Sequence, residues 1–408
     1  MQRIVIIGGG AAGFFAAVNC AEQYRQHEVI ILEKSSRVLD KVRVSGGGRC
    51  NVTHACWIAR DLVKNYPRGS QQLLSVFSRF QPSDTIAWFE RRGVDLKIED
   101  DGRMFPITDS SQTIIDCLMT AAHKAGVKIW YKHALEQLFP PTEKRPEWEL
   151  LLNNGSKIIA NKVMIATGSS PAVWRIIAAL GHSIVPPVPS LFTFHINDPR
   201  LLGLEGVSMP MVTATLPSAK LHTEGAILIT HWGLSGPAIL KLSAWAARQM
   251  HEHNYRLPIQ INWTHSYKPA ECQAYLTELR TDANTLRKQI ANYPLFEIPA
   301  LLWKRLLAPT LPDTLRWADI SNKQIAALAA QLTQCTFEVK GKSTFKDEFV
   351  TCGGVHLNEI NFKTLESKLH KGLFFGGEVL DIDAVTGGFN FQAAWSTAWI
   401  AATEMGQG

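Results

Sequence analysis

Glycines and carboxylates near the start of the 408-residue chain have the spacing of a phosphate-binding turn. Gly8, Gly10 and Gly13 follow the apolar run 3–7 as G-x-G-x-x-G. The first glycine of such a motif allows a tight turn, the second lets the backbone approach a pyrophosphate, and the third lets helix and strand pack closely. Glu33 ends the next apolar run, where a carboxylate can accept hydrogen bonds from a ribose. These residues predict a site for an adenine dinucleotide.

A second glycine-rich segment with carboxylates lies near the other end of the chain. Glu378 and Asp381 can accept hydrogen bonds from ribityl hydroxyls, and Gly388 precedes an expected helix over 390–404. The positive end of that helix would stabilise negative charge on a reduced flavin ring. Because FAD is long, a protein that holds its full length needs a distant second segment of this kind. FAD is therefore the expected cofactor.

Residues 41–53 form a third motif, KVRVSGGGRCNVT, in which consecutive glycines are flanked by polar side chains. Glycines permit unusual backbone angles and close approach, while Ser45, Arg49 and Asn51 supply donors. We expect this loop to run alongside the ribityl chain and the pyrophosphate. A plain flexible loop is the alternative.

The cysteines number seven and are scattered. Cys50 and Cys56 are further apart than the redox pair of flavin disulfide reductases, so we expect no catalytic disulfide and place Cys50 near the flavin. No Cys or His group has zinc-ligand spacing, and no metal is predicted. The odd count favours a reducing compartment, so the expected location is cytoplasmic.

His231 lies in the motif THWGLSGP, residues 230–237, and could act as an acid or a base. A structural role is the alternative. Cys50 and His231 are thus the candidate catalytic residues. No second G-x-G-x-x-G follows a strand, so a separate nicotinamide domain is not expected.

Composition describes an ordinary globular protein, with 46% hydrophobic and 19% charged residues. The net charge of +6 is spread without a long run of like charges, which disfavours a nucleic-acid partner. No apolar run is long enough to span a bilayer, so no membrane association is expected. Oligomeric state cannot be predicted.

The order of the patterns predicts an α/β fold, a Rossmann-like FAD-binding domain interrupted by a β-rich domain and a helical insert. Apolar runs predict buried strands and longer periodic segments predict helices. Strands are expected over 3–7, 29–33, 127–138, 148–153, 162–168 and 372–376, and helices over 11–24 and 113–125. The last helix, 390–404, is expected to present Phe391, Trp395, Trp399 and Ala402 on one face.

Prolines at 186–189 predict a linker into the interrupting part. Beyond it, 190–265 has a β-rich pattern and 269–334 a helical one. The expected domains are 1–188 with 345–408 for FAD binding, 189–268 with 335–344 for the β-rich domain, and 269–334 for the helical insert.

Taken together, the motifs in 8–13, 45–53, 230–237 and 376–392, with Gly353-Gly354-Val355, resemble the BaiN/RdsA/aminoacetone-oxidase-like NAD(P)/FAD-dependent flavoproteins. The likeness covers essentially the whole chain in order. One departure is Ala384, where the family pattern usually has glycine. The resemblance implies FAD as cofactor, with NAD(P)H as a candidate electron donor, but it does not choose a substrate.

By position, the resemblance assigns the ADP half to the first glycine motif and Glu33, adenine to the backbone of Leu135, and the ribityl chain and ring to Asp381, Gly388 and Asn390. Thr167 and Gly168 match an A-T-G turn. The expected cofactor-binding residues are Gly8, Gly10, Ala11, Ala12, Gly13, Glu33, Lys34, Lys41, Ser45, Gly48, Arg49, Cys50, Asn51, Leu135, Ala166, Thr167, Gly168, Gly377, Glu378, Asp381, Gly388, Phe389, Asn390 and Phe391.

The sequence thus predicts an FAD-dependent oxidoreductase that transfers hydride through flavin N5 to or from a small organic substrate. Whether it acts as a reductase or an oxidase is left open. One alternative is a flavoprotein acting on RNA, as tRNA-modifying enzymes do, and another is an FAD-bound regulatory protein without turnover.

Overall fold

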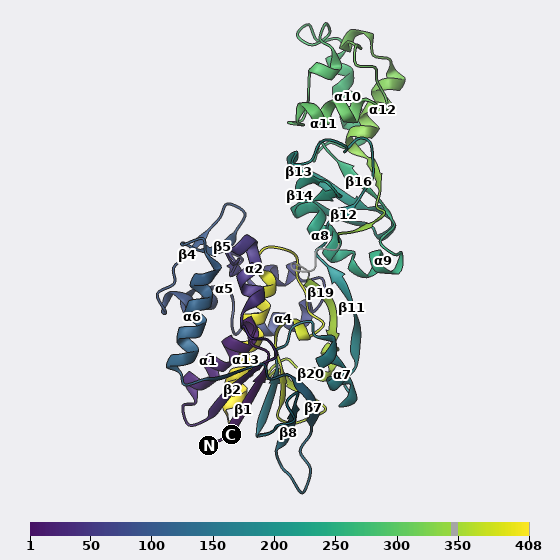
Figure 1. Ribbon diagram of the computed structural model, residues 1–408. Coiled ribbons are helices and arrows are strands. Elements are labelled where there is room, and N and C mark those ends of the chain that lie inside the picture. Colours follow the sequence, from purple (N-terminus) through teal and green to yellow (C-terminus); the bar gives the residue numbers. More distant parts are fainter. Residues whose placement is uncertain (344–349, 408) are drawn as a thin grey trace. The chain divides into compact units, whose positions relative to one another are not determined.

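The computed structural model describes residues 1–343 and 350–407. The chain divides into two compact units, residues 1–189 with 346–408 and residues 190–345 (Figure 1). The expected domain boundary at 344–345 lies outside the described residues. No helix within the described residues is long and apolar enough to cross a membrane.

In the described part of the first unit, the central sheet has seven strands in the order β20-β21-β22-β10-β1-β2-β6. The last five of these are mutually parallel, and β20 and β21 join antiparallel at one edge. This is the predicted Rossmann-type fold. The strands are β1 (Arg3–Ile7), β2 (Glu28–Glu33), β6 (Lys128–Tyr131), β10 (Lys162–Ile165), β20 (Ile360–Asn361), β21 (Glu366–Ser367) and β22 (Leu373–Phe375).

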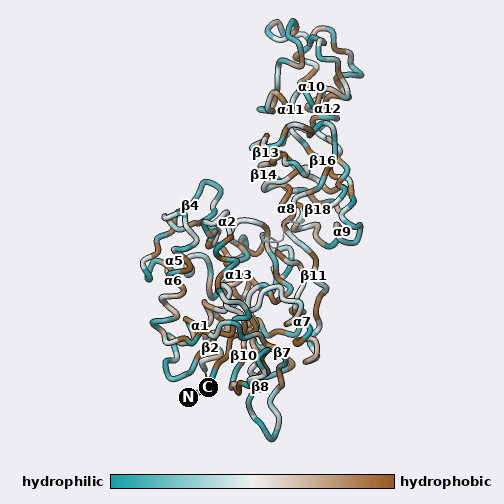
Figure 2. Tube along the Cα trace, viewed as in Figure 1, coloured by the Kyte–Doolittle hydropathy of each residue, from teal (hydrophilic) through white to brown (hydrophobic). Residues whose placement is uncertain are grey.

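Helices α1 (Ala11–Gln23) and α13 (Phe389–Gly406) pack against each other beside this sheet. Their contact includes Phe15 and Trp395, whose ring centroids are 5.2 Å apart and which are both fully buried. Burying one such side chain stabilises a fold by about 1.5–3 kcal/mol. The central strands and these helices are among the hydrophobic segments of Figure 2. The packing holds the start of α1 and the start of α13 in a fixed relation.

The remaining helices of the first unit cover the sheet and extend from it. They are α2 (Asp40–Gly48), α3 (Ala59–Leu62), α4 (Ser70–Phe77), α5 (Pro82–Glu90), α6 (Ser111–Lys124) and α7 (Pro171–Ala179). Small sheets combine β3 (Thr53–His54), β5 (Arg103–Pro106) and β4 (Leu96–Ile98); β7 (Leu135–Phe139), β8 (Trp148–Leu152) and β9 (Lys157–Ala160); and β11 (Ile184–Ser190) and β19 (Val350–Val355).

The second unit contains an antiparallel sheet and a helical part. Within its described residues the sheet order is β17-β16-β13-β14-β15-β12-β18. The strands are β12 (Phe194–His195), β13 (Ser208–Leu216), β14 (Leu221–Thr230), β15 (Gly233–Ser235), β16 (Pro258–Asn262), β17 (Cys335–Glu338) and β18 (Gly341–Lys342). The helices are α8 (Pro237–Trp245), α9 (Ala247–Glu252), α10 (Pro269–Leu279), α11 (Ala300–Leu307) and α12 (Asn322–Thr333).

Several local expectations were wrong. The prolines of 186–189 belong to strand β11, which pairs only with β19 among the described strands, and a two-stranded edge can accommodate residues without an N–H donor. The β-rich pattern of 190–265 also contains α8 and α9. The strand expected over 127–138 is two strands, β6 and β7, which belong to different sheets.

Helix α13 was expected to have one apolar face, but it is buried on nearly all sides. Trp395 and Ala402 are fully buried, whereas Phe391 and Trp399 are only partly so. The cause is that α13 runs through the interior beside α1 rather than along the surface.

Candidate functional site

The turn from β1 to α1 has the geometry that its glycines predict. Gly8 has φ +111°, and a Cβ there would lie 2.5 Å from Ala166 O. A Cβ at Gly13 would overlap Gly8 O, so helix and strand can approach only with glycine at both positions. Gly10 caps α1, and a Cβ at Gly10 would meet no atom within 4 Å. The backbone is therefore approachable where the amides of Ala11 and Ala12 begin the helix.

Glu33 lies beside this turn at the end of β2. Its carboxylate accepts hydrogen bonds from Gly9 N and from Ser35 N, both at 2.8 Å, and from the Ser35 hydroxyl at 2.6 Å. The side chain is thus fixed against the glycine turn before any ligand binds. Since a carboxylate can accept about four hydrogen bonds, it keeps capacity for a ribose hydroxyl.

Two more predicted segments meet the same turn. Ala166 and Thr167 follow β10 and pack against Gly8. Gly377 begins the short 3-10 turn 377–379, and a Cβ there would lie 3.1 Å from the Ala12 Cβ. The hydroxyl Oγ1 of Thr167 is buried and has no hydrogen-bond partner within the described part of the chain. An unsatisfied polar atom at this place suits a ligand that supplies the missing partner.

Lys41, Gly168 and Glu378 also converge. The Glu378 carboxylate lies 2.6 Å from the Lys41 ammonium and accepts a hydrogen bond from Thr351 N at 3.0 Å. A Cβ at Gly168 would lie 3.5 Å from the same carboxylate. Glu378 thus ties three segments together, a role that its expected use as a ribityl acceptor did not include.

We expected the glycine motif at 41–53 to be a loop, but its first residues are helical. Residues 40–44 form a helical turn of α2, and the chain then leaves helical geometry at Ser45, Gly46 and Gly47. A Cβ at Gly47 or Gly48 would meet no atom within 4 Å, although both have positive φ. This stretch therefore presents bare backbone, as a cofactor-lining segment requires.

Asn51 joins this motif to the start of α13. Its side-chain amide donates to Thr53 O at 3.0 Å and to Met104 O at 3.2 Å, and its oxygen accepts from Gly388 N at 2.9 Å. Gly388 has φ +90°, and a Cβ there would overlap the Thr53 carbonyl oxygen. The close approach that Gly388 permits is thus to the chain itself.

A buried hydrogen-bond network reinforces the junction. The hydroxyls of Thr53 and Thr85 donate to the Gln392 side-chain oxygen at 2.6 and 2.9 Å. Gln392 donates in turn to the Ser396 hydroxyl at 2.9 Å, which donates to Phe80 O at 2.8 Å. Because each member is satisfied, the network fixes α13 rigidly against residues 51–53.

Asn390 closes the turn before α13 rather than projecting from it. Its side chain accepts from Ala384 N at 2.9 Å and donates to Ala384 O at 3.2 Å. Ala384 does not have a positive φ, so alanine fits where glycine was the expected residue.

Two predicted aromatic residues of α13 pack within the protein. The Phe389 carbonyl oxygen accepts a hydrogen bond from the buried Tyr66 hydroxyl at 2.6 Å, and Phe391 stacks on Trp395 with ring centroids 5.5 Å apart.

Some predicted residues have other partners or lie elsewhere. The Arg49 guanidinium is 2.6 Å from the Glu99 carboxylate and 4.0 Å above the Phe105 ring. Lys34 is exposed just beyond β2. Leu135 begins β7. Just before this strand, the amides of residues 132 and 133 donate to Ser35 O and Glu33 O. His231 belongs to the second unit and its side chain is 83% exposed.

Cys50 is fully buried in a left-handed conformation with φ 61°. Burial raises the pKa of its thiol to about 12. Cys56 is partly buried, and both are free thiols. Because the thiolate is the nucleophilic form, this environment argues against Cys50 as a nucleophile.

One buried ion pair was not predicted from the sequence. Asp383, whose side chain is completely buried, pairs with Arg68, and the same two residues form an isolated β-bridge. An acidic residue within the apolar stretch IDAV, residues 382–385, was the available signal. The pair anchors the segment that leads from Asp381 to α13.

These features fit an adenine dinucleotide. The open backbone at Gly10, the oriented carboxylate of Glu33 and the unsatisfied Thr167 hydroxyl all belong to the turn around β1. The backbone is also uncovered at Gly47 and Gly48. Asn51 joins this glycine segment to the start of α13 by its hydrogen bond with Gly388 N. Such an extended cradle, built from both ends of the chain, suits FAD.

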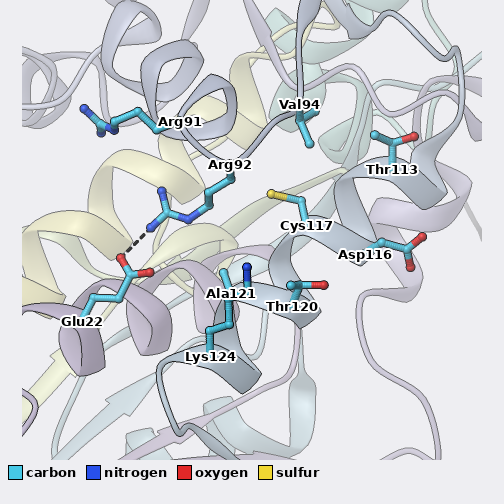
Figure 3. Close-up of a pocket in the computed structure, with 10 residues that line it drawn as sticks. All are labelled: Glu22, Arg91, Arg92, Val94, Thr113, Asp116, Cys117, Thr120, Ala121 and Lys124. Carbon is cyan, nitrogen blue, oxygen red and sulfur yellow. Dashed lines mark hydrogen bonds and ion pairs between the residues drawn. The ribbon is translucent and has the colours of Figure 1, made fainter.

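A separate cleft of about 690 Å³ lies on the flank of the first unit, between the ends of α1 and α5 and the length of α6 (Figure 3). Its cations include Arg91, Arg92 and Lys124, and Arg92 is held by Glu22 at 2.5 Å and stacks over Trp88. None of the residues that form the glycine turn lines it.

Known proteins resemble the chain over its whole length. The family described as HI0933-like protein Rossmann domain matches residues 2–404. The ribosomal RNA dihydrouridine synthase of Escherichia coli is 29% identical over 420 residues, covering 99% of this chain and 98% of that protein. The 3-dehydro-bile acid delta(4,6)-reductase of Clostridium scindens is 25% identical over 414 residues, covering 98% of each.

Among solved structures, 3-ketosteroid-delta4-(5alpha)-dehydrogenase from Rhodococcus jostii RHA1 has a similar fold, with a TM-score of 0.53 and 12% identity over 100% of this chain and 97% of that one. The resemblance inferred from the sequence motifs is confirmed by these matches. The chain belongs to the HI0933-like protein Rossmann domain family and is an FAD-dependent oxidoreductase.

Proposed function

We propose that this protein reduces a carbon–carbon double bond conjugated to a carbonyl group, with NADH or NADPH as the source of electrons. The support is the chemistry common to the two relatives that match the full length of the chain. Dihydrouridine is uridine with the ring bond next to its carbonyl saturated, and a 3-dehydro bile acid with delta-4,6 bonds is a conjugated dienone. Both names describe one hydride and one proton added across an activated bond.

The proposed reaction is balanced without oxygen. NAD(P)H gives up a hydride and becomes NAD(P)⁺, and the substrate gains that hydride at one carbon and a proton at its neighbour. FAD would relay the hydride through N5, which is the chemistry that a bound flavin supplies. The names of the two relatives support the direction toward reduction, whereas the sequence alone left reductase and oxidase open.

The chain's own residues would bind and orient the cofactor. The amides that follow Gly10 would hold the pyrophosphate, where the dipole of α1 favours negative charge. Glu33 would accept from the ribose, and the Thr167 hydroxyl would gain the partner that the described part of the chain does not give it. The start of α13, anchored by Asn51, would place its positive end at the ring.

Two substrate classes fit this reaction, a small cyclic enone and a uracil ring in RNA. They can be compared directly by incubating the purified holoprotein with NADH or NADPH and either 4-androstene-3,17-dione or unmodified ribosomal RNA transcribed in vitro. We expect one substrate to gain two hydrogens by mass spectrometry, in proportion to the nicotinamide oxidised. Nicotinamide oxidation with neither product formed would contradict the proposal and favour an oxidase. No nicotinamide oxidation at all would favour a non-catalytic flavoprotein.

A further inference from the structure

The cleft beside α6 is large enough to hold a small molecule (Figure 3). Its volume of about 690 Å³ falls within the range of about 300–1,000 Å³ that is usual for small-molecule sites. Val94, Cys117 and Ala121 line the cleft and are nearly buried, so they form its floor. The other lining residues are polar or charged. A ligand of this cleft would therefore be recognised mainly through its polar groups.

Helix α6 forms one side of the cleft. Four of its lining residues follow one another at spacings of three or four and therefore share one face of the helix, namely Thr113, Cys117, Thr120 and Lys124. At about 1.5 Å per residue, this face is about 16 Å long. The cleft is thus longer than a simple inorganic anion and suits a ligand with chemically different ends.

One cation of the cleft is held in a fixed position. The Arg92 guanidinium donates to the Glu22 carboxylate at 2.5 Å and to Trp88 O at 3.0 Å, and it lies 3.7 Å from the centroid of the Trp88 ring. The Arg92 side chain is only 19% exposed. A guanidinium has more N–H donors than these bonds use, so Arg92 can still donate to a ligand. Because it is already oriented, it loses little conformational freedom on binding.

Two further cations of the cleft are not neutralised. Arg91 and Lys124 are exposed, and neither forms an ion pair with a residue of the part of the chain that the structure describes. Both line the same cleft as Arg92. Cations gathered in a cleft attract anionic ligands more strongly than the same charges scattered over a surface.

The acids of the cleft are fewer and are already engaged. Glu22 pairs with Arg92, and Asp116 accepts a hydrogen bond from the Gln112 side-chain amide at 2.7 Å. Asp116 still has lone pairs for another donor. Burial raises the pKa of the Cys117 thiol to about 11, so this group adds no negative charge at neutral pH. The cleft thus favours an anionic group near its cations and offers a carboxylate to a hydroxyl group.

We infer that this cleft binds the phosphate ester of a hydroxylated small molecule, that is, a sugar phosphate or a nucleotide. Arg92 would bind the phosphate, because an arginine fork matches two phosphate oxygens and hydrogen bonds between charged groups are the strong ones. Arg91 and Lys124 would add positive charge, and Asp116 would accept from a hydroxyl of the ligand. None of the residues of the glycine turn lines the cleft, so this site is separate from the one expected to hold FAD.

Isothermal titration calorimetry of the holoprotein tests the class of ligand, because FAD then occupies its own site. In a buffer without phosphate, we expect ribose 5-phosphate to bind more tightly than inorganic phosphate, and ribose not to bind. AMP that binds more tightly than ribose 5-phosphate would identify a nucleotide site, and equal binding would identify a sugar-phosphate site. No binding of either ester, or inorganic phosphate binding as tightly as both, would refute the inference.

The place of binding is tested by changing Arg91 and Lys124 together to glutamine. Ribose 5-phosphate should bind at least about tenfold more weakly, because hydrogen bonds to charged groups are lost. The control is Lys144→Gln with Arg175→Gln, which removes two exposed cations of the same unit that do not line the cleft. The control should bind as wild type does. Unchanged affinity in the first pair, or an equal loss in both pairs, would overturn the assignment to this cleft.

The contact with a hydroxyl is tested by Asp116→Ala. This change should weaken the binding of ribose 5-phosphate but not that of inorganic phosphate, because only the ester carries hydroxyl groups for Asp116 to accept from. An equal loss for both ligands, or no loss for either, would contradict a hydroxylated ligand. Neither result bears on the reduction proposed above, which is measured without ribose 5-phosphate.

Discussion

At the scale of single residues, Glu33 carries the clearest functional expectation. Its carboxylate is already oriented by Gly9 N and by Ser35, so it needs no rearrangement to meet a ribose. Glu33→Ala should weaken FAD binding about ten- to a hundredfold, because a hydrogen bond to a charged group contributes about 1.5–3 kcal/mol. Fluorescence titration of the apoprotein with FAD measures this. Unchanged affinity would place the ribose elsewhere, and Glu33→Gln separates charge from shape.

The thiol at position 50 leads to a second expectation. Burial raises the pKa of Cys50 to about 12, so at pH 8 the group stays protonated and shielded. Iodoacetamide at pH 8 should leave Cys50 unlabelled in the native protein and label it after urea unfolding. The oxidised and the two-electron-reduced protein should also show the same thiol count. Two additional thiols on reduction would reveal a disulfide with Cys56 and contradict the account.

At the scale of elements, the start of α13 depends on Gly388. A side chain there would overlap the Thr53 carbonyl and strain a backbone with φ +90°. Gly388→Val should displace the helix start, weaken FAD binding and lower the flavin reduction potential. Gly181→Val is the matched control, because Gly181 has φ +93° but no atom within 4 Å of its Cβ position. If a redox titration gives both variants the wild-type potential, α13 does not serve the ring.

His182 connects three elements and makes their junction sensitive to acid. Its ring nitrogens lie 2.9 Å from the Glu359 carboxylate after β19 and 2.9 Å from the Ser367 hydroxyl of β21. Burial lowers the pKa of His182. The unfolded chain therefore takes up the proton first, and stability should fall as the pH falls below about 6.5.

The measurement is the midpoint of urea unfolding at pH 7.5 and at pH 5.5. The midpoint should drop more in wild type than in His182→Asn, which has no proton to gain. The same drop in both proteins would show that His182 does not set the pH dependence.

Strands and helices with strong local patterns were predictable from sequence. The apolar runs at 3–7 and 29–33 became β1 and β2, and the segments at 11–24 and 113–125 became α1 and α6 within about two residues, the usual uncertainty of helix ends. Elements whose nature depends on distant partners were not predictable. The proline segment 186–189 is a strand only because β19 pairs with it, and α13 is buried all round only because α1 lies beside it.

The candidate site was predictable in its residue types but less so in its contacts. Glycine spacing indicated Gly8, Gly10 and Gly13 because backbone geometry alone requires glycine at such turns. It could not indicate that Gly388 faces Thr53, or that Arg68 pairs with Asp383, because the members of each pair are far apart in the chain, 315 residues in the second case. A local pattern such as the acid within IDAV can mark one member of such a pair, but it does not identify the distant partner.

At the scale of the whole molecule, the chain divides into two compact units that differ in which predicted residues they carry. The residues expected to hold FAD belong to the unit of residues 1–189 and 346–408, while the candidate catalytic residue His231 belongs to residues 190–345. Wide spread of charge along the sequence argued against a nucleic-acid partner. The name of one full-length relative, a ribosomal RNA dihydrouridine synthase, is the one finding that weakly challenges that expectation.

The central claim, reduction of a conjugated double bond through FAD, is tested most directly by an anaerobic experiment on the purified holoprotein. NADH or NADPH is added until the flavin absorbance is bleached, and then ribosomal RNA transcript or 4-androstene-3,17-dione is mixed in without oxygen. We predict that the nicotinamide bleaches the flavin and that one of the two substrates restores its colour while gaining two hydrogens. A flavin that nicotinamide cannot bleach, or a reduced flavin that only oxygen reoxidises, would contradict the account.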